Sequence, residues 1–222
     1  MKVYKFGGAS VKNADGVRNL KHIIEGQSEL FIIVSAMGKT TNALEEVFDF
    51  YRTSNIEGAQ NKIDQIAAYH QTIIDDLFGE PRQMGQVEAL LSELHRFVTT
   101  VPYDASRAEE RYDRMVAFGE LISTTIISKY LNHSGLRNRW IDMRTTLLTN
   151  QRHKDANVDI KASKHRLRAA IENTGVGVFV GQGFIGGAPD GTTTTLGREG
   201  SDYSAAIVAN VLDAESMSVW KD

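Results

Sequence analysis

Two runs of consecutive apolar residues, most of them β-branched or aromatic, constrain the fold of this chain more than any other feature of its sequence. The first run is Leu-Phe-Ile-Ile-Val over 30–34, and the second is Val-Gly-Val-Phe-Val over 176–180. Neither run alternates with polar residues, which is typical of strands that are buried on both faces. Strands of this kind occur almost only in parallel sheets with helices on both sides.

Turns and helical periodicity follow these strands. Further strands are predicted at 3–6, 139–142 and 217–220, and helices at 14–25, 42–51, 161–173 and 202–212. The repeated order of strand, turn and helix predicts right-handed βαβ units. We therefore expect a three-layer α/β/α sandwich with a mainly parallel sheet that contains 3–6, 30–34 and 176–180. Residues 56–132 have the apolar spacing of helices, and we interpret them as a helical insertion.

The composition excludes several classes of protein. The 222 residues include 25 Lys and Arg against 28 Asp and Glu, and the net charge of -3 argues against a nucleic-acid-binding protein. The absence of cysteine excludes disulfides, thiolate nucleophiles and cysteine-ligated zinc. No run approaches the ~20 apolar residues of a membrane span, and the N-terminus lacks the apolar core of a secretory signal. We therefore expect a soluble cytoplasmic protein with no nucleic-acid or membrane partner.

The first glycine loop, Lys5-Phe6-Gly7-Gly8-Ala9-Ser10, follows the first predicted strand. In α/β proteins ligands bind at this carboxyl edge of the sheet. Two glycines let the backbone approach an anion, and a neighbouring lysine supplies a point charge for a phosphate. The alternative is a tight turn with a surface lysine.

The second loop, Ser-Ala-Met-Gly-Lys-Thr-Thr-Asn over 35–42, contains a false signal. Its Gly-Lys-Thr resembles part of a P-loop, but that motif requires a glycine where this chain has Ile33. A hydroxyl-rich turn that opens a helix still suits a small carboxylate. The alternative is that a side chain of 40–42 only caps the helix.

The third loop region also contains a misleading match. Gly-Gln-Gly-Phe-Ile-Gly over 181–186 fits G-x-G-x-x-G, but the Gly-Ala-Pro-Asp-Gly that follows cannot open the helix a dinucleotide site needs. Farther on, Arg198 can grip a carboxylate through two parallel hydrogen bonds. Ser201 and Asp202 begin a helix, whose N-terminus favours an anion, and Asp202 can orient a reacting group. The alternative is that either residue merely caps that helix.

Glu120 follows Gly119 in a long apolar helix. Burying a carboxylate without a partner is costly. From the residues alone, an ordinary exposed glutamate is therefore the favoured interpretation, and a partner for a substrate ammonium is the alternative.

Five motifs, in order along the whole chain, resemble those of the aspartate kinases of the amino acid kinase superfamily. They are Lys-Phe-Gly-Gly-Ala-Ser at 5–10, Val-Ser-Ala at 34–36 with Thr-Asn at 41–42, Phe-Gly-Glu at 118–120, Gly-Phe-Ile-Gly at 183–186 and Leu-Gly-Arg-Glu-Gly-Ser-Asp at 196–202. Two residues depart from the family pattern. Ala9 replaces a threonine, and Glu199 stands where a glycine is common.

The resemblance implies ATP-dependent phosphorylation of the β-carboxylate of L-aspartate to 4-phospho-L-aspartate, the first step towards lysine, threonine and methionine. It implies that Lys5 neutralises charge on the transferred phosphoryl group and that Asp202 positions groups at the reaction centre. The implied aspartate-binding residues are Ser35, Thr41, Glu120 for the ammonium, Arg198 for a carboxylate, and Ser201. The implied phosphate- or nucleotide-binding residues are Lys5, Gly7, Gly8, Ser10, Lys221 and Asp222. Mg²⁺ would bridge the ATP phosphates, and no residue of this chain is assigned to a metal.

The resemblance also implies that residues 1–222 form the N-terminal part of a catalytic domain. The nucleotide-binding half and a pair of ACT regulatory domains are expected to be absent, so the fragment should be nearly inactive alone, and its parent is expected to be a homo-oligomer. Two alternatives remain. One is a kinase for glutamate or acetylglutamate, and the other is a non-catalytic amino-acid-binding module.

Overall fold

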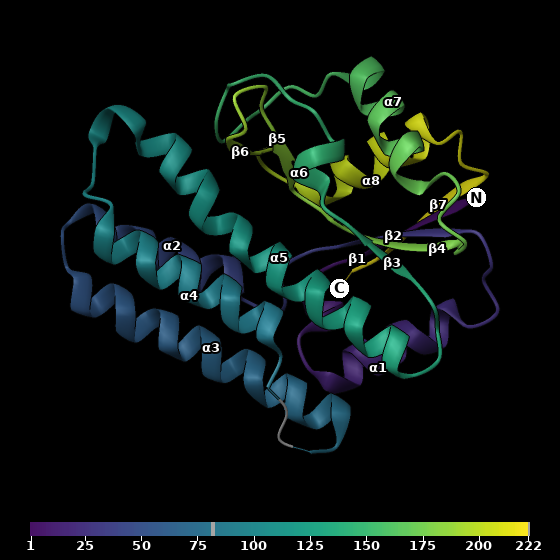
Figure 1. The fold of residues 1–222 in the computed structure, drawn as a ribbon, viewed down its shortest axis with the longest axis horizontal. Coiled ribbons are helices and arrows are strands. Elements are labelled where there is room, and N and C mark those ends of the chain that lie inside the picture. Colours follow the sequence, from purple (N-terminus) through teal and green to yellow (C-terminus); the bar gives the residue numbers. More distant parts are fainter. Residues whose placement is uncertain (81–82, 222) are drawn as a thin grey trace.

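A five-stranded parallel sheet forms the centre of the protein, in the order β3-β4-β2-β1-β7 (Figure 1). The computed structural model describes residues 1–80 and 83–221. The strands are β1 (Lys2–Phe6), β2 (Leu30–Val34), β3 (Arg139–Ile141), β4 (Val178–Gln182) and β7 (Ser216–Trp220). The prediction that 3–6, 30–34 and 176–180 share one parallel sheet is therefore confirmed.

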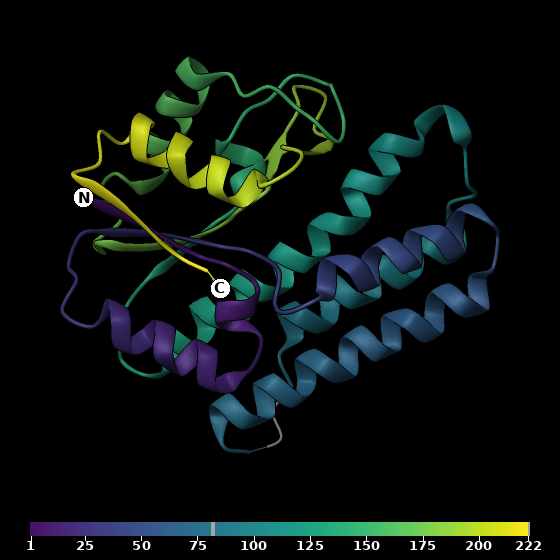
Figure 2. The same cartoon turned by 180° about the vertical axis from the view of Figure 1, so that it is seen from behind.

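Alternate residues of β2 pack into two separate cores. Leu30, Ile32 and Val34 belong to one apolar cluster, whereas Phe31 and Ile33 belong to another. Helix α1 (Ala14–Ile24) and the second half of α5 (Ala108–His133) cover the first face, and α7 (Ile160–Ile171) and α8 (Gly200–Val211) cover the second (Figures 1 and 2). This is the three-layer arrangement expected from uninterrupted apolar strands.

Four helices build an arm beside the sheet. They are α2 (Thr40–Arg52), α3 (Ile56–Phe78), α4 (Gly85–Thr100) and the first half of α5 (Figure 2). The turns η1 (Ala9–Val11) and η2 (Ala105–Arg107), the short helix α6 (Met143–Thr146) and the two-stranded sheet of β5 (Ile185–Gly187) and β6 (Thr193–Thr195) complete the described elements. No helix in the two described ranges has the length and apolar character needed to cross a membrane.

Several helices begin earlier than the apolar periodicity predicts. Helix α2 begins at Thr40 rather than at residue 42, and α8 begins at Gly200 rather than at Asp202. The first turn of a helix carries polar residues that do not contribute to an apolar stripe, so periodicity underestimates it. In both helices the additional residues lie next to the glycine loops at the carboxyl edge of the sheet.

The close approach of α5 to the loop after β2 depends on Gly119. A Cβ atom at this position would lie 2.8 Å from the Cβ of Ala36 and 3.3 Å from Leu44. Helix α5 is buried on all sides here, with an unbroken series of buried residues over 115–128. The helix therefore cannot shift outward without opening the core.

We predict that Gly119→Ala lowers the free energy of unfolding by about 1–3 kcal/mol, because overpacking forces neighbouring groups to move. Gly85→Ala is the matched control, since Gly85 also lies in a helix but a Cβ atom at its position would meet no other group within 4 Å. That control should leave stability unchanged or raise it by up to about 1 kcal/mol. Chemical denaturation monitored by circular dichroism measures both, and equal effects of the two substitutions would contradict the close packing at Gly119.

Candidate active site

The loops at the carboxyl edge of the sheet enclose a cavity of about 430 Å³. The strand register explains why they meet: Phe6 of β1 pairs with Val34 of β2, and Val34 pairs with Gln182 of β4, so the strands end side by side. The cavity is lined by Lys5, Gly8, Ser35, Ala36, Gly38, Thr41, Glu120, Phe184, Gly197, Glu199, Gly200, Ser201, Asp202 and Lys221. Cavities of about 530 and 480 Å³ lie elsewhere, but no buried charged side chain lines either of them.

A chain of three charged groups lies on one side of the cavity. Lys5 is only 6% exposed, and its Nζ lies 2.7 Å from Oδ1 of Asp202. Nζ of Lys221 donates to Oδ2 of the same carboxylate over 2.8 Å. Burial acts to raise the pKa of Asp202, but the two lysines outweigh it and hold this pKa below its usual range. Asp202 is therefore ionised between two cations, of which Lys5 is the buried one.

Glu120 lies on the other side of the cavity and is 3% exposed. Its Oε1 accepts the backbone N–H of Ala36 over 3.0 Å, while its buried Oε2 has no hydrogen-bond partner among the described residues. Burial raises the pKa of Glu120 to about 8, against the opposing effects of the Ala36 hydrogen bond and the charge of Lys5. The interpretation of Glu120 as an exposed helix glutamate is therefore wrong, because Gly119 allows α5 to bring this carboxyl under the loop after β2.

The glycine loops interlock through the backbone. The N–H of Gly38 donates to the carbonyl of Gly8 over 2.9 Å, and a Cβ on Gly8 would lie 2.6 Å from the carbonyl oxygen of Ala36. No larger residue fits at Gly8 unless the two loops separate. The first two sequence loops thus form one continuous wall of the cavity.

Not every residue predicted for the site faces the cavity. Gly7 and Ser10 are absent from its lining; the N–H of Gly7 and Oγ of Ser10 both donate to the carbonyl of Trp220, over 2.8 and 3.2 Å. Arg198 is exposed and does not line the cavity. Asp222 lies outside the described residues. The remaining predicted residues, Lys5, Gly8, Ser35, Thr41, Glu120, Ser201, Asp202 and Lys221, line it together.

The structure adds groups that the sequence did not indicate. Ala36 contributes a backbone N–H, which no side-chain pattern can reveal. Glu199 lines the cavity with a left-handed backbone, φ 56°, a conformation that glycine adopts without strain. In the sequence, the only indication that position 199 is special is that glutamate stands where a glycine is common in the resembling family.

The cavity lining combines two lysines and three carboxyl side chains with the hydroxyl groups of Ser35, Thr41 and Ser201. Within residues 1–80 and 83–221, no group of three or more His, Asp or Glu side chains is placed to hold a metal ion. A divalent cation that arrives with a polyphosphate keeps several waters and needs few protein ligands.

The chain is similar in sequence and in fold to known proteins. The sequence model of the amino acid kinase family matches residues 1–222. Lysine-sensitive aspartokinase 3 of Escherichia coli is 30% identical over 99% of this chain, and the match covers 48% of that protein. The chloroplastic bifunctional aspartokinase/homoserine dehydrogenase 2 of Arabidopsis thaliana is 29% identical over 99% of the chain, which covers 25% of that protein. The chain thus spans about a quarter to a half of the length of these relatives.

Solved structures show the same fold. The crystal structure of E. coli aspartokinase III with aspartate and ADP matches all of this chain and 49% of its own, with a TM-score of 0.86 and 29% identity. The structure of that enzyme with lysine and aspartate matches equally well. These similarities confirm the family and the fold class that the five motifs predicted.

The buried carboxyl of Glu120 predicts a pH-dependent stability. In the unfolded chain it ionises near its ordinary pKa of 4.5, whereas the folded chain keeps the proton up to about 8. The folded state binds more protons in this window, so stability falls as pH rises from about 4.5 to about 8. Glu120→Gln should remove a few kcal/mol of this decline, since one pKa unit corresponds to about 1.4 kcal/mol. Denaturation at both ends of the window measures it, and identical pH profiles for the two proteins would refute the raised pKa.

Proposed function

The chain belongs to the amino acid kinase family, and from this premise we propose that it contributes to an ATP-dependent aspartate kinase. In the proposed reaction a β-carboxylate oxygen of L-aspartate attacks the γ-phosphorus of ATP. The bond between that phosphorus and the β,γ-bridging oxygen breaks, giving 4-phospho-L-aspartate and ADP. The alternatives are a kinase for glutamate or acetylglutamate and a binding module without catalysis.

The observation that carries this proposal is the unpartnered Oε2 of Glu120 in the same cavity as the Lys5–Asp202 pair, as seen within the described part of the chain. A buried carboxyl oxygen without a partner is costly, and a cation that enters the cavity satisfies it as the carboxyl group ionises. An amino acid supplies an ammonium of the right charge, while its second carboxylate extends towards the cationic side. The solved complexes of E. coli aspartokinase III contain aspartate, which supports this choice of substrate.

The charged side of the cavity suits phosphoryl transfer, which depends mainly on positioning and electrostatic stabilisation. Lys5 is buried and held by Asp202, so its ammonium is oriented before the substrate arrives. The attacking carboxylate is already ionised at neutral pH, and the reaction therefore needs no strong general base. Ser35, Thr41 and Ser201 add hydroxyl groups along the cavity, and we propose that they hold the substrate.

ATP and Mg²⁺ are proposed as partners of the same edge of the sheet. Lys221 extends the positive charge of the site beyond Asp202, where a polyphosphate can bind. Mg²⁺ would neutralise phosphate charge when bound. The ADP in the E. coli complex supports a nucleotide cosubstrate. We further propose that most adenine contacts lie in the half of the relatives that this chain does not match, and that residues 1–222 supply the aspartate and phosphate contacts.

A hydroxamate assay on the longest natural form of the protein distinguishes the candidates. It traps the acyl phosphate formed from L-aspartate, L-glutamate or N-acetyl-L-glutamate in the presence of ATP and Mg²⁺. Aspartate hydroxamate alone supports the proposal. Product mainly from glutamate or acetylglutamate would transfer the assignment to those kinases, and no product with any substrate would favour the binding module.

In the longest natural form of the protein, Lys5→Ala should lower kcat about a hundredfold or more, because loss of one contact that stabilises developing charge typically costs ~3–4 kcal/mol. Lys12→Ala is the matched control: Lys12 lies in the same loop region but lines a different cavity. The control should keep kcat within about twofold of the native value. Steady-state kinetics with varied aspartate measures both, and a Lys5→Ala enzyme with native kcat would show that the assigned role is wrong.

Aspartate binding should release protons near pH 7. Glu120 is mainly protonated in the free protein, because burial raises its pKa to about 8. A substrate ammonium beside Oε2 favours the ionised form, so its binding should expel up to one proton. Calorimetry in two buffers of different ionisation enthalpy measures this release. Glu120→Gln should show none and should bind aspartate more weakly, and succinate, which lacks the ammonium, should release no proton from the native protein.

A further inference from the structure

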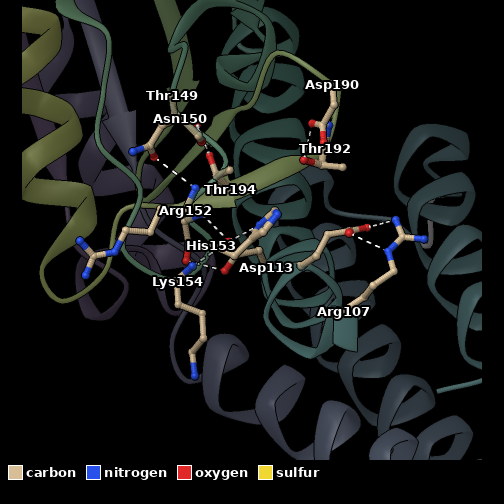
Figure 3. A network of polar contacts seen from close by, with 12 residues as sticks. Arg107, Asp113, Thr149, Asn150, Arg152, His153, Lys154, Asp190, Thr192 and Thr194 are labelled. Atoms are coloured by element: carbon tan, nitrogen blue, oxygen red, sulfur yellow. Dashed lines mark hydrogen bonds and ion pairs between the residues drawn. The ribbon is translucent and has the colours of Figure 1, made fainter. Parts of the chain in front are cut away.

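Asp113 is a fully buried carboxylate that lies outside the cavity. It belongs to α5 and accepts four hydrogen bonds, and Figure 3 shows its side chain beside His153 and Lys154. Its Oδ2 accepts the backbone N–H groups of Lys154 and Thr195, over 2.9 and 3.0 Å, and Nδ1 of His153 over 3.0 Å. Its Oδ1 accepts the hydroxyl of Thr195 over 2.7 Å. Burial raises the pKa of Asp113, and the hydrogen bonds from Thr195, Lys154 and His153 oppose that rise.

These four bonds join segments that are distant in the sequence. Thr195 ends β6 and directly precedes the loop over 196–199, of which Gly197 and Glu199 line the cavity. Lys154 belongs to a turn that packs against the same loop: a Cβ on Gly197 would lie 3.1 Å from Oδ1 of Asp155. The two segments also bond to each other, because the N–H of Ala156 donates to the carbonyl of Thr195 over 2.9 Å. Asp113 therefore holds the loop at its start and holds the turn that supports it.

Helix α5 connects this anchor to the cavity. Glu120 follows Asp113 by seven residues, which is about two helical turns, so both side chains lie on the same side of α5. The separation along the axis is about 10 Å. Residues 115–128 of α5 are all buried, so most of the helix between Asp113 and Glu120 is held in the core and the two carboxylates cannot move independently of each other. The position of loop 196–199 relative to Glu120 is thus set by one rigid element.

We propose that Asp113 is a positioning residue that fixes loop 196–199 against Glu120 and thereby determines how tightly the amino-acid substrate binds. The substrate itself rests on the function proposed above, whereas the anchoring of the loop does not. Four hydrogen bonds to one carboxylate hold the two segments firmly in place, since each bond restricts the geometry of the others and two of the donors are backbone N–H groups. Loss of the hydrogen bonds to Asp113 should make loop 196–199 more mobile and weaken substrate binding, while leaving the Lys5–Asp202 ion pair intact.

The hairpin of β5 and β6 offers a matched set of threonine variants. Thr195→Val removes one hydroxyl that Asp113 accepts, and Thr195→Ser restores it. Thr192→Val is the control, because Thr192 lies in the same hairpin region but bonds to Asp190 instead (Figure 3). Asp113→Asn keeps the shape of the side chain but cannot accept all four hydrogen bonds.

The experiment measures L-aspartate binding by calorimetry and backbone hydrogen exchange without ligand on residues 1–222. Asp113→Asn should raise the Kd for aspartate about tenfold, and Thr195→Val severalfold, whereas Thr195→Ser and Thr192→Val should stay within about twofold. Exchange over 194–200 should accelerate in the first two variants while β1 and β2 remain protected.

Unchanged exchange over 194–200 in Asp113→Asn would overturn the proposal, as would native aspartate affinity. The proposal would also be overturned if hydrogen exchange in Asp113→Asn and Thr195→Val accelerated equally in the sheet and in the loop, and if Thr195→Ser did not restore native exchange. That result would show a general structural role for Asp113. If the native chain binds no aspartate, the proposed function fails, and the exchange measurement alone then decides whether Asp113 anchors the loop.

Discussion

Burial of β2 on both faces is the constraint on which the rest of the structure depends. A strand with five buried residues requires a neighbouring strand on each edge and helices on each face. Strands β1 and β4 pair with the two edges of β2, both in parallel register. Parallel strands end at the same edge of the sheet, so the loops after β1, β2 and β4 must meet there. The cavity at this edge is therefore a consequence of the strand pattern, and its chemistry depends on which residues those loops and α5 carry.

The charged groups on the two sides of the cavity differ in whether they have partners, and this difference favours one orientation of a ligand. On one side, Lys5 and Lys221 flank Asp202, so a buried cation is already paired and oriented. On the other side, Glu120 accepts a hydrogen bond from Ala36, and its second oxygen has no partner in the described ranges. A ligand with an ammonium at one end and an anionic group at the other complements both sides. This complementarity, rather than the fold alone, connects the geometry to an amino-acid kinase.

The sheet and much of the site were predictable because their signals are local. Uninterrupted apolar runs identify buried strands, and Lys5, Gly8 and Asp202 lie next to predicted strand or helix ends. The burial of Glu120 was not predictable from its neighbours, since a helix that is buried all round has no polar face to mark its orientation. Asp113 was missed because its partners Lys154 and Thr195 lie 41 and 82 residues away in the sequence. The assignment of Arg198 to a substrate carboxylate stays a prediction, since this residue is exposed and does not line the cavity.

In the proposed binding mode, Glu120 receives the ammonium of an amino acid whose other carboxylate faces Lys5. A crystal structure of residues 1–222 soaked with L-aspartate would show both ends of the ligand at once. We predict the aspartate nitrogen within about 3 Å of Oε2 of Glu120 and the β-carboxylate directed towards Nζ of Lys5. Aspartate bound in the reverse orientation, or bound outside the cavity at the carboxyl edge of the sheet, would contradict this binding mode.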